Sequence, residues 1–310
     1  MSKKISELTT ATDVTVNDFF QVVDLEDSTM AASGTNKKIS ARTLGNNLPV
    51  TATGSSASRS LKDRFADTVN VKDFGAVGDG VTDDTGALNQ AFDASENSVL
   101  IIPNGVYRIT SRLSVYKNGI KVVGLGNPII KTTDNAPTSF DSMQIRGSDV
   151  TLDGITLDGN NPFPAISGNN NCISLSTTLA TVSNVIFENC TFQNYKGYGV
   201  YSFTAGTLNG IEFNNCKFLN FTSSAEVPTG SIQLVTPITS NLKVHGCTFS
   251  NITGCGVAAR SQNGVAEVKN ICITGNVFDH NQYEYTSMGV EIWKAKNSSI
   301  SGNSFANARM

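Results

Sequence analysis

Three acidic residues towards the C-terminal end, Asp279, Glu284 and Glu291, have the side chains that acid–base catalysis requires. Hydrolysis of a glycosidic bond uses two carboxyl groups, about 5 Å apart in retaining enzymes and about 6.5 to 9.5 Å apart in inverting enzymes. Glu284 with Glu291, or Asp279 with Glu291, is therefore the candidate catalytic pair if the reaction takes place within one chain.

A second group of residues has the composition of a carbohydrate-binding surface. Aromatic rings stack on the faces of sugars, and arginine, glutamine and carboxylate groups hydrogen-bond to hydroxyl or acidic substituents. The candidate substrate-binding residues are Tyr201, Phe203, Gln233, Arg260 and Trp293, which is the only tryptophan of the chain. In the alternative interpretation, Tyr201, Phe203 and Trp293 pack under loops or against a neighbouring protomer. The first interpretation requires an element that places all of these residues on one face.

A ten-residue repeat predicts such an element. The segment VTLDGITLDG begins at Val150, and similar segments begin at residues 185, 211, 242, 271 and 298. The eighth position of the repeat is occupied by Leu157, Phe192, Phe218, Phe249, Phe278 and Phe305. A chain that returns to the same place at such intervals, with like residues stacked, is typical of a parallel β-solenoid. We therefore predict an all-β fold, a parallel β-helix, with the phenylalanines in its core.

A second row of alternating residues lies between these segments. Its inward-facing members are predicted to be Ile173/Leu175, Val200/Ser202, Ile232/Leu234, Val257/Ala259 and Val290/Ile292. Successive side chains of a strand point to opposite faces, so the residues next to these pairs face outward. The outward positions include Tyr201, Gln233, Arg260, Glu291 and Trp293. The candidate residues are thus expected on successive strands that are about 4.8 Å apart.

The composition excludes several other functions. The 310 residues have Lys+Arg 23 and Asp+Glu 26, a net charge of −3, and no run of basic residues, which argues against nucleic-acid binding. No apolar stretch reaches the roughly 18 residues of a membrane span, and the N-terminus lacks the apolar core of a secretory signal. The six cysteines have no CxxC spacing and are predicted to be small buried side chains. We expect no metal, no cofactor and no membrane insertion.

The chain is predicted to contain two domains. Residues 1–49 alternate like short strands and form a small β-rich unit. Residues 50–65 are rich in serine and threonine, a composition typical of a linker. The β-helix is assigned to residues 66–310. It is expected to begin with an α-helix, N-capped by Thr82 or Asp83, that covers the end of the core.

Three short motifs follow one another in Val71–Ala91: Asp73-Phe74-Gly75, Gly78-Asp79-Gly80 and Asp83-Asp84-Thr85. This stretch closely resembles the opening motif of the pectate-lyase-like right-handed β-helix superfamily, which is found in polygalacturonase-type glycosidases and bacteriophage tailspikes. The front of the chain, from Lys4–Leu8 to Lys37–Ser40, resembles the short virion-anchoring module of phage tail fibres and tailspikes.

This resemblance implies a homotrimer that residues 1–49 attach to a phage tail or baseplate protein. The β-helix would recognise, and in many such proteins cleave, a surface polysaccharide of the bacterial host. Such a protein is assembled in the host cytoplasm and released as part of the virion. The resemblance transfers no catalytic residue, because the clustered Asn-Thr-Asp, Asp-Asp, Gly-His-Gly and Arg-Ile-Lys motifs of polygalacturonases are absent from the repeats.

Two other functions are compatible with parts of this pattern. A non-catalytic receptor-binding fibre, or a structural adaptor of the phage tail, would have the same anchor and the same β-helix. A secreted hydrolase or lyase is disfavoured by the missing signal and the anchor-like front. The sequence stops at Met310, just after the predicted Phe305 strand. We therefore expect the β-helix to be incomplete at its C-terminus or to be covered there by another subunit.

Overall fold

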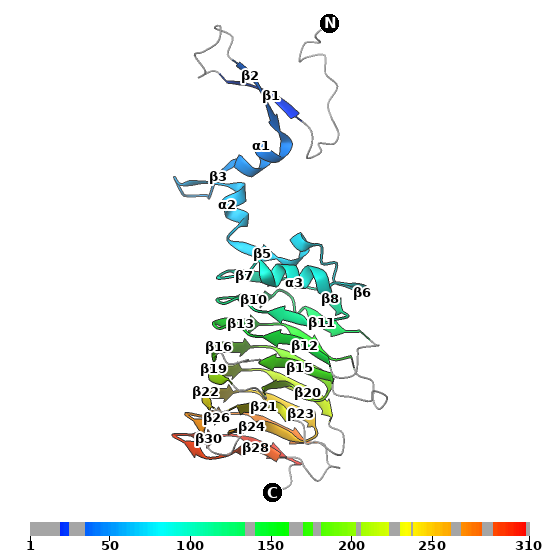
Figure 1. Ribbon diagram of the computed structural model, residues 1–310, viewed down its shortest axis with the longest axis vertical. Helices are drawn as coiled ribbons and strands as arrows, with labels where there is room; N and C mark the ends of the chain where they lie inside the picture. The colour runs from blue at the N-terminus through cyan, green and yellow to red at the C-terminus, as the bar shows by residue number, and fades with distance from the viewer. Residues whose placement is uncertain are drawn as a thin grey trace. The chain divides into compact units, whose positions relative to one another are not determined.

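The computed structural model separates the chain into two compact units, Met1–Asp67 and Thr68–Met310. In the second unit, parallel strands stack on one another (Figure 1). The residues that the structure describes are 19–24, 35–133, 140–160, 170–175, 181–202, 206–222, 230–236, 238–261, 268–280 and 288–307.

The N-terminal unit contains two antiparallel strand pairs and two short helices. The pairs are β1 (Phe19–Asp24) with β2 (Thr35–Ser40), and β3 (Pro49–Thr51) with β4 (Ser58–Ser60). The helices are α1 (Ala41–Asn47) and α2 (Leu61–Phe65). The stretch predicted as a linker therefore contains regular structure, namely β4 and α2.

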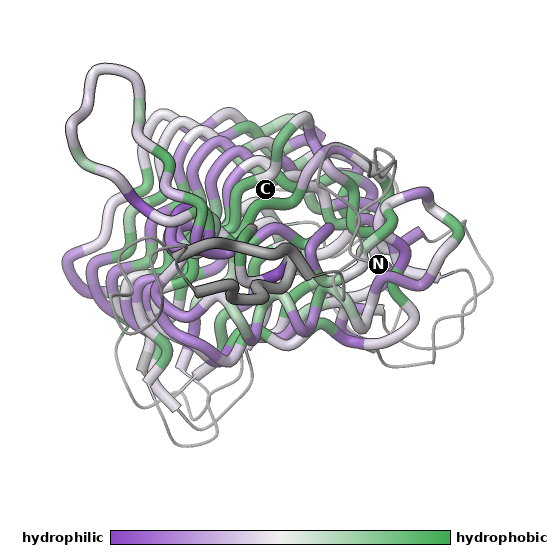
Figure 2. Tube along the Cα trace, turned by 90° about the horizontal axis from the view of Figure 1, so that it is seen from above, coloured by the Kyte–Doolittle hydropathy of each residue, from purple (hydrophilic) through white to green (hydrophobic). Residues whose placement is uncertain are grey.

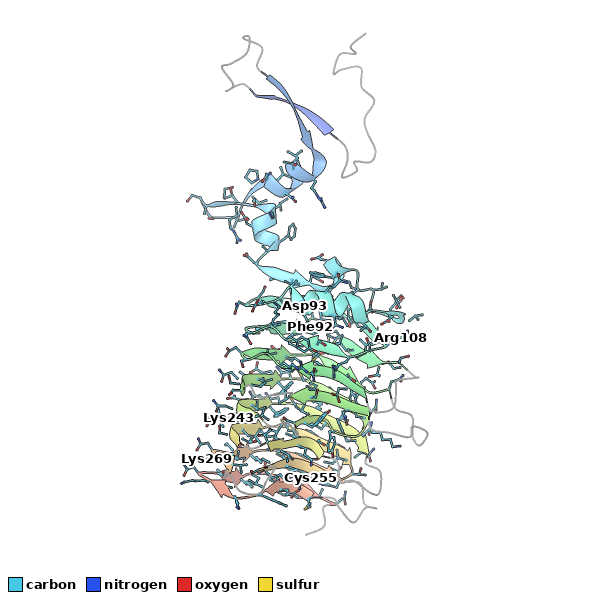
Figure 3. The ribbon with its side chains drawn as sticks, viewed as in Figure 1. Phe92, Asp93, Arg108, Lys243, Cys255 and Lys269 are labelled. Atoms are coloured by element: carbon cyan, nitrogen blue, oxygen red, sulfur yellow. The ribbon has the colours of Figure 1, made fainter. Side chains whose placement is uncertain are left out.

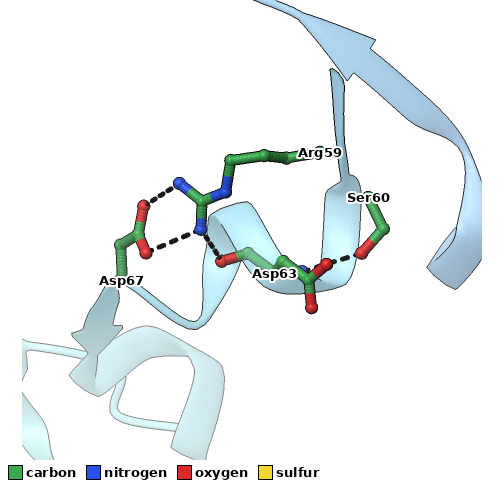
Figure 4. A network of polar contacts seen from close by, with 4 residues as sticks. All are labelled: Arg59, Ser60, Asp63 and Asp67. Carbon is green, nitrogen blue, oxygen red and sulfur yellow. Dashed lines mark hydrogen bonds and ion pairs between the residues drawn. The ribbon is translucent and has the colours of Figure 1, made fainter. Parts of the chain in front are cut away.

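Arg59 connects the residues before and after α2 (Figure 4). Arg59 donates hydrogen bonds to both carboxylate oxygens of Asp67, at 2.7 and 2.8 Å, and to the backbone carbonyl of Asp63 at 2.6 Å. The Ser60 hydroxyl accepts from the Asp63 N–H at 3.1 Å and caps the helix. Because the ion pair is exposed, it fixes local geometry more than it stabilises the fold. The roles of residues 1–49 as anchor and 50–65 as linker stay predictions.

The second unit is a right-handed parallel β-helix with three sheets, which confirms the predicted fold class. The first sheet contains β5 (Thr68–Asn70), β7 (Val99–Ile102), β10 (Lys121–Gly124), β13 (Val150–Asp153), β16 (Thr181–Glu188), β19 (Thr207–Asn214), β22 (Ile238–His245), β25 (Val268–Lys269), β26 (Cys272–Thr274), β29 (Ala295–Lys296) and β30 (Ser299–Ser301). The second sheet contains β6 (Asp79–Asp83), β8 (Val106–Ile109), β11 (Ile129–Thr132), β14 (Thr156–Asp158), β17 (Thr191–Lys196), β20 (Lys217–Thr222), β23 (Thr248–Ile252), β27 (Val277–His280) and β31 (Ser304–Ala306). The third sheet contains β9 (Leu113–Val115), β12 (Phe140–Ile145), β15 (Asn170–Leu175), β18 (Val200–Ser202), β21 (Gly230–Thr236), β24 (Cys255–Ser261) and β28 (Met288–Ile292).

The phenylalanines of the repeat form the predicted column inside the β-helix. Phe192, Phe218, Phe249, Phe278 and Phe305 are cross-strand neighbours in the second sheet. Their ring centroids are 4.6 to 4.9 Å apart. Such aromatic pairs contribute about 0.5–1.5 kcal/mol each beyond the burial of their area. The first four rings are fully buried, whereas Phe305 in the last rung is 49% exposed.

The corner between the first and second sheets is made by a single residue with positive φ. That residue is Gly154, Asn189, Asn215, Gly246, Gly275 or Gly302, depending on the rung. The next side chain points inward, and in three successive rungs it is a cysteine whose thiol donates to a backbone carbonyl. All six cysteines are free and five are buried, as predicted. Figure 2 looks down the rungs, which superpose because each corner repeats.

The helix α3 (Thr85–Asp93) stands in the first rung where the third sheet would otherwise have a strand. It follows a 3₁₀ turn, η2 (Val71–Phe74), and buries Leu88, Ala91 and Phe92 in the core. The side-chain amide of Asn89 accepts the Ser114 N–H at 2.8 Å and donates to the Arg112 carbonyl at 3.3 Å. The amide thus forms the backbone hydrogen bonds that a neighbouring strand would otherwise form at the edge of β9, as expected for a capping helix. Figure 3 labels Phe92 on α3.

The predicted start of this helix is one or two residues early. Asp84, not Thr82 or Asp83, occupies the N-cap position. Asp83 instead accepts from the N–H and the hydroxyl of Thr85. The Asp84 carboxylate accepts the N–H groups of Val77 and Gly78 at 2.6 and 2.9 Å. The acidic motif therefore fixes the turn that leads into α3, which is a structural role.

Candidate functional site

The register of the third sheet gathers most of the predicted residues on one outward face. Ser174, Tyr201, Gln233, Ala258 and Glu291 are successive cross-strand neighbours on β15, β18, β21, β24 and β28. We call these five positions the outward row. Their inward neighbours form the predicted core pairs, for example Ile232 with Val257. Because successive side chains of a strand point to opposite faces, the row faces outward, as predicted from the sequence.

At the C-terminal end of the outward row, three predicted residues form a cluster. We call Arg260, Glu291 and Trp293 the Trp293 cluster. Arg260 lies two residues after Ala258, and Trp293 two residues after Glu291, so all face outward from β24 and the end of β28. The Arg260 Nη1 is 3.4 Å from Oε1 of Glu291, and the guanidinium lies 5.3 Å from the centroid of the Trp293 ring. The side chains of Arg260 and Glu291 are 27% and 18% exposed. Trp293 remains 49% exposed, so its ring is available to a ligand.

A second cluster lies further towards the N-terminal end of the same sheet. The Tyr201 hydroxyl donates to Oδ1 of Asp141 at 2.7 Å, and the Asn171 amide donates to the same oxygen at 3.0 Å. Asn171 in turn accepts the Tyr198 N–H at 3.0 Å. The rings of Tyr198 and Tyr201 are 5.2 Å apart. We call Asp141, Asn171, Tyr198 and Tyr201 the Asp141 cluster.

Electrostatics keep the tyrosines of this cluster protonated. Burial, followed by the charge of Asp141, raises the pKa of Tyr201 well above its ordinary value. Burial also raises the pKa of Tyr198, and the Arg260 guanidinium acts in the opposite direction. Both hydroxyls can serve as hydrogen-bond donors at neutral pH.

Polar atoms without partners lie in the outward row between the two clusters. Ser174 is 6% exposed and Gln233 is 4% exposed, yet neither the Ser174 hydroxyl nor the Gln233 carbonyl oxygen has a hydrogen-bond partner. They flank Tyr201 on neighbouring strands. A buried polar atom without a partner costs about 1–3 kcal/mol.

Of the other predicted residues, Asp279 lies on another sheet, and two fall outside the part of the chain that the structure describes. Asp279 lies on β27 in the second sheet, where its carboxylate accepts from the Asn307 amide at 2.8 Å. The structure therefore places Asp279 and Glu291 on different sheets. Phe203 and Glu284 fall outside the described residues, so the Glu284–Glu291 pair stays a prediction.

The sequence analysis missed Asp141, Asn171 and Tyr198. Asp141 lies on β12, before the first recognised repeat, and pairs with Asn171 across β12 and β15. Aligning β12 with β15 would have found this polar pair, because both residues stand three positions before an outward residue of their strand. Tyr198 directly precedes β18, where no regular spacing marks it.

None of the helices in the described ranges has the length and apolar character needed to cross a membrane. Within the same ranges, no cluster of three or more histidine, cysteine, aspartate or glutamate side chains could hold a metal ion.

Comparison with known proteins identifies relatives that share this architecture. A mannuronan C5-epimerase of Azotobacter vinelandii, AlgE1, is 34% identical in an alignment 108 residues long that covers 29% of this chain and 8% of that protein. The match therefore spans less than a tenth of that relative's length. The exopolygalacturonase of Thermotoga maritima superposes with a TM-score of 0.54 at 16% identity, over 76% of this chain and 66% of that one. Tailspike protein 2 of the Escherichia coli O157:H7 bacteriophage CAB120 superposes with a TM-score of 0.52 at 15% identity, over 84% and 37%.

These structural likenesses establish the β-helix fold. The family model described as "Rhamnogalacturonase A/epimerase, pectate lyase-like" matches residues 68–302, from the first strand of the β-helix to its last rung. The chain therefore belongs to the rhamnogalacturonase A/epimerase, pectate lyase-like family.

Proposed function

We propose that the outward face of the third sheet binds a polysaccharide chain. The observation that carries this proposal is the combination of an exposed Trp293 beside the Arg260–Glu291 pair with unpartnered polar atoms at Ser174 and Gln233. The indole offers a stacking surface, and the partly exposed Arg260 guanidinium beside it offers hydrogen bonds to hydroxyl or acidic groups. The family assignment supports a polysaccharide as the ligand.

The length of the outward face favours a polymer over a single sugar. From Gln144 on β12 to Glu291 on β28 the sheet advances by five strand spacings, on the order of 24 Å. Gln144 and Ser174 are cross-strand neighbours, so the row continues without interruption. A chain of several sugar units would contact the Asp141 cluster and the Trp293 cluster at the same time.

For the reaction, we propose that the bound chain is cleaved and that Glu291 is the essential carboxylate. Its side chain is 18% exposed and lies beside Arg260, so it can reach a ligand stacked on Trp293. In a hydrolase Glu291 would be the base or nucleophile, and Glu284 would supply the acid. The Arg260 guanidinium would bind hydroxyl or acidic groups next to the cleaved bond.

At the level of the organism, we propose a homotrimeric phage tailspike subunit. Residues 1–49 would dock to a tail or baseplate protein, and the β-helix would meet the surface polysaccharide of the bacterial host. The motif in Val71–Ala91, the anchor-like front and the similarity in fold to a tailspike protein support this proposal. The protein would then reside in the virion.

A non-catalytic receptor-binding fibre or tail adaptor is the second candidate. The specific observation in its favour is that Asp279 lies on a different sheet from Glu291, where its carboxylate is bonded to the Asn307 amide, which speaks against that predicted catalytic pair. Such a protein would use the same face for binding alone.

One assay distinguishes these functions. The protein is incubated with purified capsular polysaccharide or lipopolysaccharide of the host, and reducing ends and unsaturated uronates are measured. New reducing ends alone indicate hydrolysis, and both products indicate a lyase. Binding without either product supports the fibre or adaptor. Absence of binding to every such polysaccharide contradicts the proposed function.

A further inference from the structure

A groove of about 560 Å³ lies on the outward face of the second sheet, away from the site described above. It crosses β11, β14, β17 and β20 and includes the corners that precede them. Its lining includes the side-chain amides of Asn127, Asn189, Gln193 and Asn215 and the hydroxyls of Thr156 and Thr191. The volume is within the range of sites for small organic ligands.

The lining combines neutral polar groups with small apolar surfaces. Four side-chain amides and two threonine hydroxyls can each donate and accept hydrogen bonds. Ile129 and Leu219 are half-buried and offer apolar surface to C–H groups. The cross-strand neighbours of Lys217 are the uncharged Thr191 and Thr248. By contrast, Lys243 on the first sheet is paired with Glu212 at 2.6 Å.

Several of these groups are held in place before any ligand binds. The Asn189 amide donates to Asp153 at 3.0 Å, and the Gln193 amide donates to Asp158 at 2.8 Å. Asn189 and Asn215 occupy the positive-φ corner, which fixes the direction of their side chains. A fixed donor or acceptor loses little conformational freedom on binding.

We infer that this groove is a second carbohydrate site, which takes a short segment of an acidic glycan with a carboxylate or sulfate near Lys217. Amides and hydroxyls on a rigid surface suit sugar hydroxyls, and the apolar residues suit the C–H face of a ring. The inference rests on the proposed function only for the choice of a polysaccharide as ligand. Two sites on one chain would raise the avidity for a repeating polymer.

The test uses the full chain and two probes, the acidic mannuronan hexasaccharide and the neutral cellohexaose. Because Trp293 is the only tryptophan, its fluorescence reports binding at the third sheet alone, whereas calorimetry reports binding at both sites. In the variant Thr191→Glu, the new carboxylate lies opposite Lys217 and would pair with it. The matched control is Val277→Glu, which has the same outward position on β27 and lies outside the groove.

We expect mannuronan binding with two components in calorimetry, and stronger binding of mannuronan than of cellohexaose. Thr191→Glu should remove one component and leave the fluorescence change intact, and Val277→Glu should change neither. Lys217→Met should weaken the same component by about tenfold, the effect of losing one hydrogen bond to a charged group.

The outcomes separate the two proposals. If Thr191→Glu alters neither signal, the groove is not a site, although the fluorescence change still supports the third sheet. If Thr191→Glu abolishes the heat and wild-type fluorescence never responds, the groove stands and the proposed third-sheet site fails. If neither hexasaccharide gives heat, the inference is overturned.

Discussion

The outward faces of the first and third sheets differ although the same rungs build both. On the first sheet the polar side chains are solvated and paired: Lys243 is 55% exposed and lies 2.6 Å from Glu212, and His245 bonds to Thr274 at 3.0 Å. Figure 3 shows Lys243 and Lys269 along the flank of the β-helix. On the third sheet Ser174, Gln233 and Ala258 are only 1 to 6% exposed.

This difference indicates which face of a regular fold is the better candidate for a functional site. An exposed ion pair such as Glu212–Lys243 is worth about 0 to 1 kcal/mol and needs no further explanation. Polar atoms that are out of water and unpartnered cost free energy, so each of them calls for a specific explanation. The following experiments test that contrast.

The largest expected effect is that of Glu291→Gln on glycan cleavage. Removing the carboxylate proposed to be essential should lower the rate by about 10²- to 10⁴-fold, while binding persists. Release of reducing ends from the host polysaccharide measures the rate. The control is Glu212→Gln on the first sheet, which should leave the rate unchanged. Equal losses in both variants would erase the contrast between the sheets.

Replacement of the exposed indole should weaken binding more than it affects folding. Trp293→Ala removes one stacking contact, for which we expect a roughly tenfold weaker Kd. The thermal midpoint should change little, because the side chain is about half exposed. Titration with oligosaccharides of the host glycan measures the Kd. An unchanged Kd would show that the ligand does not reach the Trp293 cluster.

Two histidines provide a pH test of burial. His280 is 2% exposed, and burial lowers its pKa below the ordinary value. The folded state then binds fewer protons than the unfolded state, so stability is complete above pH ~6.5 and declines as the pH falls below it. His280→Asn should flatten this decline, measured by urea unfolding between pH 7.5 and 5. His245→Asn, at an exposed position, is the control; a similar flattening there would contradict the role of burial.

The smallest expected effect is a change in the free energy of unfolding. It compares two glutamines of the third sheet, one with a hydrogen-bond partner for its side-chain carbonyl and one without. Gln233→Leu removes a carbonyl that lacks a partner, so the free energy of unfolding should stay constant or rise by up to about 1 kcal/mol, and glycan binding should weaken. Gln144→Leu should instead lose about 1 kcal/mol, because Gln144 accepts from the Tyr116 hydroxyl. Denaturant unfolding measures both. A loss at Gln233 as large as that at Gln144 would contradict our interpretation of the outward row.

The regular parts of this fold were predictable because one residue type recurs at one position. Phe218, Phe249 and Phe278 stack as expected, since a phenylalanine in one rung is best covered by a phenylalanine in the next. Cys247 and Asn276 show why the corner tolerates change. The thiol donates to the Phe213 carbonyl, and the amide of Asn276 donates to the Val244 carbonyl, so both satisfy an equivalent group.

The site was only partly predictable. Alternation placed Arg260, Glu291 and Trp293 on one face, and the structure brings them into contact. It could not place the hydroxyl of Tyr201, which reaches across two strands to Asp141, because side-chain direction depends on neighbours outside the repeat. The groove on the second sheet was not predicted either, because its lining comes from four strands and the corners before them, and not from one motif.

The in-register stacking of the rungs gives the β-helix a fixed advance per turn. Insertion or deletion of one complete turn would shift everything beyond it by a single strand spacing, about 4.8 Å, without altering the chemistry of any face. The distance between the Asp141 cluster and the Trp293 cluster can therefore change only in such increments. Addition or loss of whole turns during evolution could thus match the spacing of the two clusters to a polymer with a different repeat length, without any substitution in the clusters themselves.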